Sequence, residues 1–348
     1  MGTVWFCLVA GMLAAYAILD GFDIGVGILH LCIAHTDAER RTLIRTIGPV
    51  WDGNEVWLIA AGGTLYFAFP LLYASSFSGF YLPLMMVLWL LILRGVSLEF
   101  RGHIGGFIWP VFWDGVFSFS SVLLAIFLGA ALGNVVRGVP LDASGHFFEP
   151  LWTNFLPAGQ TGILDWYTVL IGIAAFAALS LHGAAWVALK TTDALHERAA
   201  RIVSSLWWAV AALTILITMV TYRLLPVHIW NYPRHPWGFI FPVLAIAGLL
   251  GIKWFTQRRE EGRAFGASCA YLAGMLASVA FSLYPRVLPS SANPLNGLNI
   301  SNAKAADYGL RIGLIWWPIG IALAIAYTVF VYRSFAGKIS AAEDEEGY

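Results

Sequence analysis

Long apolar segments dominate this sequence and restrict what it can fold into. A membrane-spanning helix needs about 20 mostly apolar residues. Segments of that kind occur nine times, at residues 4–31, 48–72, 77–98, 110–136, 163–190, 202–224, 237–256, 264–287 and 308–333. The hydrophilic pieces between them are too short to fold as a separate soluble domain. The sequence therefore predicts an all-α, polytopic transmembrane helical bundle of about nine spans, forming one domain over residues 1–333.

The composition supports a lipid environment. Hydrophobic residues make up 59% of the chain and charged residues only 11%, whereas a soluble domain carries about a quarter charged residues. The net charge is zero, so we expect membrane lipids and no nucleic acid among the partners. The three cysteines, Cys7, Cys32 and Cys269, have no disulfide or metal-site spacing, and we expect no metal site.

The basic residues give the chain a direction across the membrane. Lys and Arg concentrate in cytoplasmic loops. Of the 20 in this chain, thirteen lie in one set of predicted loops, six in the opposite set, and Arg94 lies inside a span. This bias predicts an N-terminus outside and a C-terminus in the cytoplasm. The acidic segment 334–348 is expected to be a disordered cytoplasmic tail.

Ionisable residues from five predicted spans gather near the cytoplasmic side. They are Asp20 and Asp23 in the first span, Asp52 and Glu55 in the second, Arg94 and Glu99 in the third, Asp114 in the fourth and His182 in the fifth. A lone charge in the middle of a bilayer costs at least about 2.5–3.5 kcal/mol, so these groups are expected to face the bundle interior and one another. Residues three apart share a helix face, which makes two carboxylate pairs that, with Arg94, predict a network of shared protons.

Other interpretations of these residues stay open. The acids could lie at headgroup level and be solvated, and Asp114 could be stabilised by a helix start alone. Gly21 and Gly25 could permit a close helix crossing or mark a helix break that lines a cavity. The aromatic Trp57, inside the second span, could stack on a quinone or pack in the core.

The residues alone leave two classes of function. One is a proton-conducting subunit of a redox enzyme, and the other is a proton- or cation-coupled secondary transporter. Transporters commonly have broken helices at matching positions in two halves. The "LDGFD" segment has no second copy in the C-terminal half, which weakly disfavours the transporter.

Four segments together identify a family. "LDGFDIGVGIL", "GPVWDGNEVWLIAAGGTLYFAFPLLYASSFSGFY", "GNVVRGVP" and "YPRVLPSS" resemble subunit II of cytochrome bd quinol oxidase. The resemblance covers nearly the whole chain and is densest over residues 16–101. It implies a two-subunit terminal oxidase in the bacterial cytoplasmic membrane that oxidises quinol and reduces oxygen to water.

The resemblance also implies where cofactors and partners lie. Subunit I is expected to carry two b-type haems and haem d, while this chain firmly binds no cofactor and supports that subunit. A structural quinone, and a small accessory transmembrane peptide as a further partner, are left open.

Several residues of this chain match positions of interest in the family. The resemblance implies a proton pathway that includes Asp23, Asp52 and Arg94, with Glu99 at a position where an acid is expected close to the route. It places Trp57 beside a bound structural quinone. Asp20 and Glu55 join the expected pathway through their place in the predicted network. No catalytic residue is expected in this subunit.

Overall fold

The computed structural model describes residues 1–157, 160–225 and 229–339. The expected acidic tail lies mostly outside the described residues. The longer helices are α1 (Gly2–Ile33), α3 (Trp51–Ala68), α5 (Tyr81–Phe100), α6 (Ile108–Arg137), α7 (Trp166–Lys190), α8 (Asp193–Leu224), α10 (Ile240–Gln257), α11 (Glu261–Leu283) and α12 (Asp307–Ser334). The shorter elements are α2 (Asp37–Ile47), α4 (Pro70–Gly79), α9 (Asn231–Arg234), the 3-10 helices η2 (Pro236–Phe239) and η3 (Pro294–Asn296), and strands β1 (Arg286–Leu288) and β2 (Leu298–Asn299).

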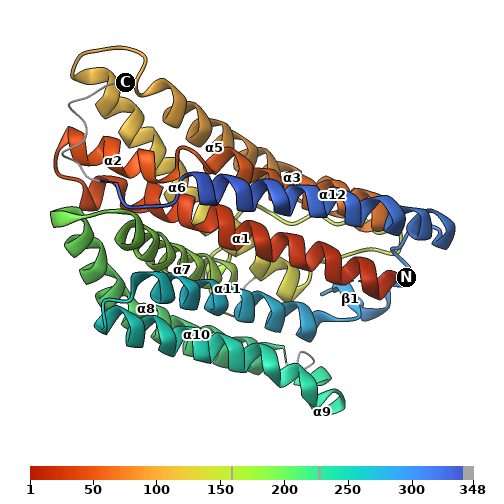
Figure 1. The fold of residues 1–348 in the computed structure, drawn as a ribbon. Helices are drawn as coiled ribbons and strands as arrows, with labels where there is room; N and C mark the ends of the chain where they lie inside the picture. The colour runs from red at the N-terminus through yellow and green to blue at the C-terminus, as the bar shows by residue number, and fades with distance from the viewer. Residues whose placement is uncertain (158–159, 226–228, 340–348) are drawn as a thin grey trace.

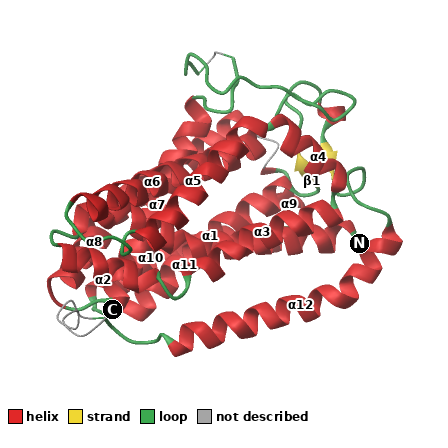
Figure 2. Ribbon diagram, turned by 90° about the horizontal axis from the view of Figure 1, so that it is seen from above, coloured by secondary structure: helices red, strands yellow, loops and turns green. Residues whose placement is uncertain are grey.

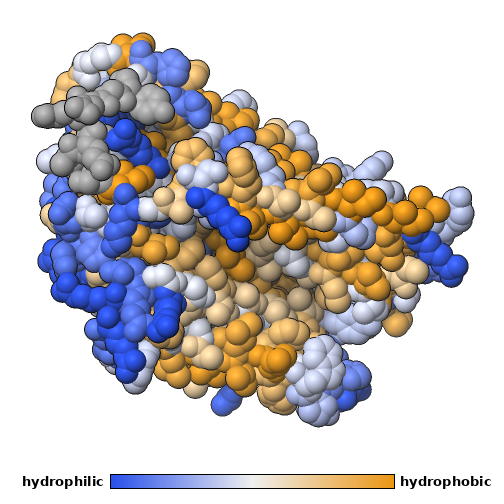
Figure 3. Space-filling model, in the orientation of Figure 1, coloured by the Kyte–Doolittle hydropathy of each residue, from blue (hydrophilic) through white to orange (hydrophobic). Residues whose placement is uncertain are grey.

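The long helices run roughly parallel to one another and confirm the all-α polytopic prediction (Figure 1). Within the described residues, eight of them are long and apolar enough to cross a membrane. The end that holds α2 and the start of α8 is rich in hydrophilic residues, while apolar side chains cover much of the length of the bundle (Figure 3). This is the distribution that a bilayer around the bundle requires.

The predicted span 48–72 differs from a single membrane helix. The structure places α3 and α4 there, separated at Phe69, whose φ of −134° and ψ of 65° are not helical. Pro70 begins α4, and a proline disfavours helical geometry in the residue before it and lacks the N–H for the helical ladder. α3 does not count among the eight apolar candidates, so a total of nine spans stays a prediction.

Helix α1 lies at the centre of the bundle because small residues let its neighbours approach. A side chain on Gly25 would overlap the backbone of Gly183 in α7, and one on Gly27 would overlap Ser121 in α6. α1 is one continuous helix through Gly21, so the close crossing, and not the helix break, is what these glycines provide.

The remaining elements lie around this core. α10 and α11 form a tightly packed pair in which a side chain on Gly248 or Gly274 would meet the backbone of the other helix. α12 lies to one side of the bundle (Figure 2). Its ends are tied back by Leu310, whose carbonyl accepts from Trp5, and by Tyr332, which donates to Asn54. The antiparallel pair β1–β2 lies at the end of the bundle near the N-terminus.

The α1–α7 crossing gives a matched test. We expect Gly183→Ala to destabilise the protein by about 1–3 kcal/mol, because a methyl group there forces two backbones apart. Gly11→Ala is the control, since a side chain at Gly11 meets no atom of the described chain within 4 Å. Thermal unfolding of the purified complex measures both variants, and equal midpoints would contradict the packing argument.

Candidate functional site

A buried ion-pair cluster joins three helices in the interior. Arg94 of α5 is fully buried, and its Nη2 lies 2.7 Å from Asp20 Oδ1 of α1 and 3.0 Å from Glu55 Oε2 of α3. The side chain of Glu55 is 20% exposed, whereas that of Asp20 is fully buried. The headgroup-level interpretation therefore does not describe Asp20. We refer to Arg94, Asp20 and Glu55 as the Arg94 cluster.

The second acid of α1 has a different partner. Asp23 is buried at 1% exposure and accepts a hydrogen bond of 2.7 Å from the Asn54 side-chain amide. The same amide also donates to the Leu19 carbonyl at 3.2 Å, and the Asn54 side-chain oxygen accepts from Tyr332 of α12 at 2.9 Å. Asp23 and Asp20 are one helical turn apart on the same face. Asp23 thus lies beside the Arg94 cluster and links it to α12.

Two of the predicted residues lie outside this cluster. On α5 the buried stripe is Leu90, Arg94 and Ser97, and Glu99 is rotated by about 140° from Arg94 and is exposed. On α3, Asp52 is on the same face as Glu55 and one turn before it, but it lies in the first turn of the helix and is exposed.

Trp57, the remaining predicted residue, is half-buried on α3.

A second charged group is centred on Asp114 of α6, and the sequence analysis did not single out the partners of this carboxylate. Its carboxylate lies 2.6 Å from Arg101 Nε, 2.6 Å from His30 Nε2 and 3.3 Å from Arg40 Nη1. Arg101 also pairs with Asp37 of α2 at 2.6 Å. Partial burial by itself would lower the pKa of Arg101. The bonds to Asp114 and Asp37 outweigh burial and raise this pKa.

The sequence signal for the partners of Asp114 is weak. Arg101 is seven residues after Arg94 and therefore continues the same face of α5, which places a cation opposite the start of α6. His30 offered no such signal, because a lone histidine in an apolar helix is usually a core residue. Stabilisation of Asp114 by the start of its helix alone therefore does not describe this carboxylate, which contacts His30, Arg40 and Arg101.

The two buried histidines do not form a haem site within the described residues. Haem needs axial ligands at matched depth on facing helices. His182 Nδ1 lies 2.7 Å from Ser268 Oγ, and its Nε2 lies 2.9 Å from the Ile18 carbonyl. His30 Nε2 is hydrogen-bonded to Asp114 Oδ1. The same described part of the chain holds no group of three His, Cys, Asp or Glu that could bind a metal ion.

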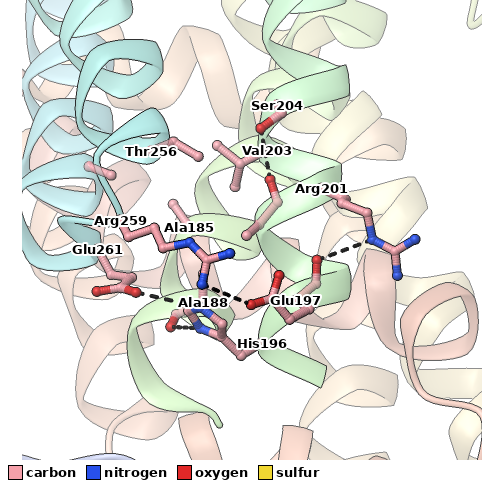
Figure 4. A pocket seen from close by; sticks show the side chains of 12 residues that line it. Ala185, Ala188, His196, Glu197, Arg201, Val203, Ser204, Thr256, Arg259 and Glu261 are labelled. Carbon is pink, nitrogen blue, oxygen red and sulfur yellow. Dashed lines mark hydrogen bonds and ion pairs between the residues drawn. The ribbon is translucent and has the colours of Figure 1, made fainter. Parts of the chain in front are cut away.

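A pocket of about 180 Å³ opens at the end of the bundle that holds α2 (Figure 4). In it His196 Nε2 lies 3.5 Å from Glu261 and Arg259 Nη1 lies 3.4 Å from Glu197. His196 Nδ1 also lies 2.8 Å from the Ala188 carbonyl. Each of these charges is matched within the pocket, so the contacts tie α8 to α11 and to the turn before it.

The Arg94 cluster and the membrane-spanning fold define a class of protein: a polytopic membrane protein with a charged network buried inside its helical bundle. Residues 1–335 match the family model described as "Cytochrome bd terminal oxidase subunit II". The chain belongs to this family. It is therefore a subunit of a cytochrome bd-type terminal oxidase, a multi-pass protein of the bacterial inner membrane.

Individual relatives agree with this assignment. The chain is 33% identical to the "Probable cytochrome oxidase subunit 2" of Haemophilus influenzae, with 97% of this chain and 95% of that one covered. It is 30% identical to the "Cytochrome bd ubiquinol oxidase subunit 2" of Bacillus subtilis, with 97% and 96% covered. The solved bd oxidase from Geobacillus thermodenitrificans has the same fold, with a TM-score of 0.73 at 19% identity, covering 96% of this chain and 98% of that one. These relatives support the oxidase subunit and not the transporter.

Removal of Arg94 should be costly. We expect Arg94→Gln to destabilise the protein by about 3–5 kcal/mol, because it leaves Asp20 buried without its cation. Arg263→Gln is the matched control, since Arg263 is 71% exposed and forms an ion pair only with Glu260 within the described residues, and it should cost about 1 kcal/mol or less. Thermal unfolding of the purified complex measures both. A small effect at Arg94 would mean that the cluster adds little to stability.

The contact between α2 and α8 should depend on pH. Partial burial by itself would raise the pKa of Glu39. Hydrogen bonds from the Arg198 side chain and from the His35 and Thr36 backbone outweigh burial and lower this pKa. A lowered folded-state pKa adds stability above the unfolded-state pKa, and that stability is lost as pH falls through the folded-state value. We expect Glu39→Gln to cost about 1 kcal/mol or less at pH 7 and nothing at a pH below both values. Unfolding midpoints at the two pH values measure this, and a constant difference would contradict it.

Proposed function

We propose that this chain supports a haem-bearing subunit I and supplies it with protons from the cytoplasm. In this proposal the complex oxidises quinol and reduces oxygen to water, with two b-type haems and haem d in subunit I. Oxygen reduction consumes protons, so a route from the cytoplasmic side, with quinol protons released outside, builds a membrane potential. The haems supply the redox chemistry, and the residues of this chain hold and move protons.

The observation that carries the proposal is the charge balance of the buried groups. Three carboxyl groups, those of Asp20, Glu55 and Asp23, lie together with one guanidinium, that of Arg94. An uncompensated negative charge inside a membrane protein is costly, so the group can lower its charge by binding protons. Asp23 Oδ1 and Arg94 Nε are buried and have no hydrogen-bond partner among the described residues. Such atoms are ones that water bonds, and water chains carry protons.

The exposure of the acidic side chains decreases from Asp52 through Glu55 to Asp20, and we refer to these three residues as the proton row. Asp52 is exposed in the first turn of α3. Glu55 is one turn deeper at 20% exposure, and Asp20 beyond it is fully buried. Asp52 lies at the end of the span next to the Arg-rich helix α2, the end with the cytoplasmic charge bias. We infer that protons enter at Asp52 and pass through Glu55 to the Arg94 cluster, which Asp23 adjoins. Glu99 lies off this row.

We also propose that Trp57 contacts a structural quinone. It is half-buried and lies two residues after Glu55 on α3, so its indole is available to stack against a quinone held between the subunits. A structural quinone there would seal the proton row from lipid. A small accessory peptide has no further support from the described residues.

We expect Asp52→Asn to lower quinol-driven oxygen consumption by about tenfold or more, because general acid–base groups commonly contribute that much to proton transfer. The haem spectrum of the complex should be unchanged. Glu99→Gln is the matched control, an exposed acid at the same side of the membrane and off the row, and should stay near the activity of the unmodified complex. Oxygen uptake by the purified complex, recorded beside its visible spectrum, measures both.

Two outcomes would contradict this proposal. Unchanged activity in both Asp52→Asn and Glu55→Gln would show that protons do not pass along this row. Loss of haem d from an inserted complex would show that Asp52 acts in assembly instead.

A further inference from the structure

A cavity in the other half of the bundle is separate from the Arg94 cluster. It has a volume of about 250 Å³ and lies between α6, α7, α8, α10 and α11. Its wall on α8 runs from Thr214 to Tyr222, which is about 12 Å of helix, and so covers less than half of a hydrocarbon core about 30 Å thick. These residues lie at the end of α8 away from α2, so the cavity belongs to the outer leaflet in the predicted orientation.

The cavity is held open by contacts across it. Tyr167 of α7 lies 2.9 Å from Thr221 Oγ1 of α8, and Tyr271 of α11 lies 2.7 Å from Thr214 Oγ1 of α8, each measured from the tyrosine hydroxyl. The close backbone contact at Gly248 fixes α10 against α11. The neighbouring helices therefore cannot close the space without breaking these hydrogen bonds or overlapping backbones.

Four hydroxyl groups in the wall donate hydrogen bonds to backbone carbonyls of their own helices. Thr214 donates to the Val210 carbonyl at 2.7 Å and Thr218 to the Thr214 carbonyl at 2.7 Å. Ser278 and Ser282 each donate to a carbonyl of their own helix, at 2.7 and 2.8 Å. The rest of the wall is largely apolar, with residues such as Ile217, Leu249 and Met275. A largely apolar wall whose serines and threonines mostly donate to their own helices holds hydrocarbon better than polar head groups.

Cations lie near the outer end of this cavity. Arg223 follows the wall residue Tyr222 in the last turn of α8, and Arg234 ends α9 two residues after Tyr232. Tyr232 donates to the carbonyl of the wall residue Ser278 at 3.2 Å. The sequence has no Asp or Glu between Glu197 and Glu260. Neither arginine forms an ion pair with a described residue, so a phosphate at the outer surface complements them.

We propose that this cavity binds one acyl chain of an anionic phospholipid, whose phosphate is held by Arg223 and Arg234. The lipid fills the space that the hydroxyl contacts keep open and links α8 to α9, α10 and α11. This proposal is independent of the proton row, which lies on other helices.

The cavity is tested with the purified two-subunit complex. Thr218→Trp places a large side chain on the wall, and Ile215→Trp is the matched control because Ile215 is 57% exposed on the same helix and does not line the cavity. The complexes are incubated with phosphatidylglycerol or phosphatidylcholine of equal chain length, exchanged into lipid-free detergent and analysed by native mass spectrometry. An intact haem spectrum verifies assembly. We expect the unmodified complex and Ile215→Trp to retain one more phosphatidylglycerol than Thr218→Trp does.

The head-group site is tested separately. We expect Arg223→Gln and Arg234→Gln each to reduce the preference for phosphatidylglycerol over phosphatidylcholine by about fivefold, from about 1 kcal/mol for each basic residue near a phosphate. Inorganic phosphate alone should not protect the complex from thermal unfolding, whereas phosphatidylglycerol should. The proposal is overturned if Thr218→Trp retains as much lipid as Ile215→Trp, if the two lipids are retained equally, or if the retained molecule is a quinone.

Discussion

Burial of the Arg94 guanidinium places a demand on the helices around it. A guanidinium inside the hydrocarbon region is stable only with carboxylate partners, and those partners come from two other helices, Asp20 from α1 and Glu55 from α3. The carboxylates must in turn be kept from lipid. Gly25 of α1 and Gly183 of α7 let α7 pack closely against another side of α1, about 140° around the helix from Asp20. The helix that carries Asp20 is therefore held in the bundle interior both by its ion pair and by this close packing.

The same face of α5 connects this cluster to the end of the bundle. Arg94, Ser97 and Arg101 are buried along it, and Arg101 pairs with Asp114 of α6 and with Asp37 of α2. One helix face thus organises charges at two depths. The deeper group has an excess of acids, which suits proton binding. The group at the end of the bundle balances two arginines, Arg40 and Arg101, against two aspartates, Asp37 and Asp114, which suits holding helix ends together.

The sequence predicted the burial of Asp20 and Arg94 better than the direction of the side chains around them. Their burial follows from their position within apolar segments, where an unpaired charge is costly. Direction depends on which neighbour each helix face meets, and for this reason Glu99, five residues after Arg94, is exposed and lies outside the cluster. Asp52 is also exposed, because it lies at the start of its helix, one turn before Glu55. Asn54 donates a hydrogen bond to Asp23, but because it is uncharged its sequence position gives no signal of this role. The break before Pro70 could have been predicted from the proline itself.

The proposed proton row ends inside the protein, and this has a consequence for energy conservation. Beyond Asp20 toward the N-terminus, residues 2–19 of α1 contain no charged side chain. In the other half of the bundle the cavity wall has hydroxyls that donate to the protein itself. In the proposed function, protons that enter at Asp52 therefore leave sideways, toward the partner subunit where oxygen is reduced. A subunit that delivers protons to its partner and does not let them through preserves the membrane potential that the oxidase builds.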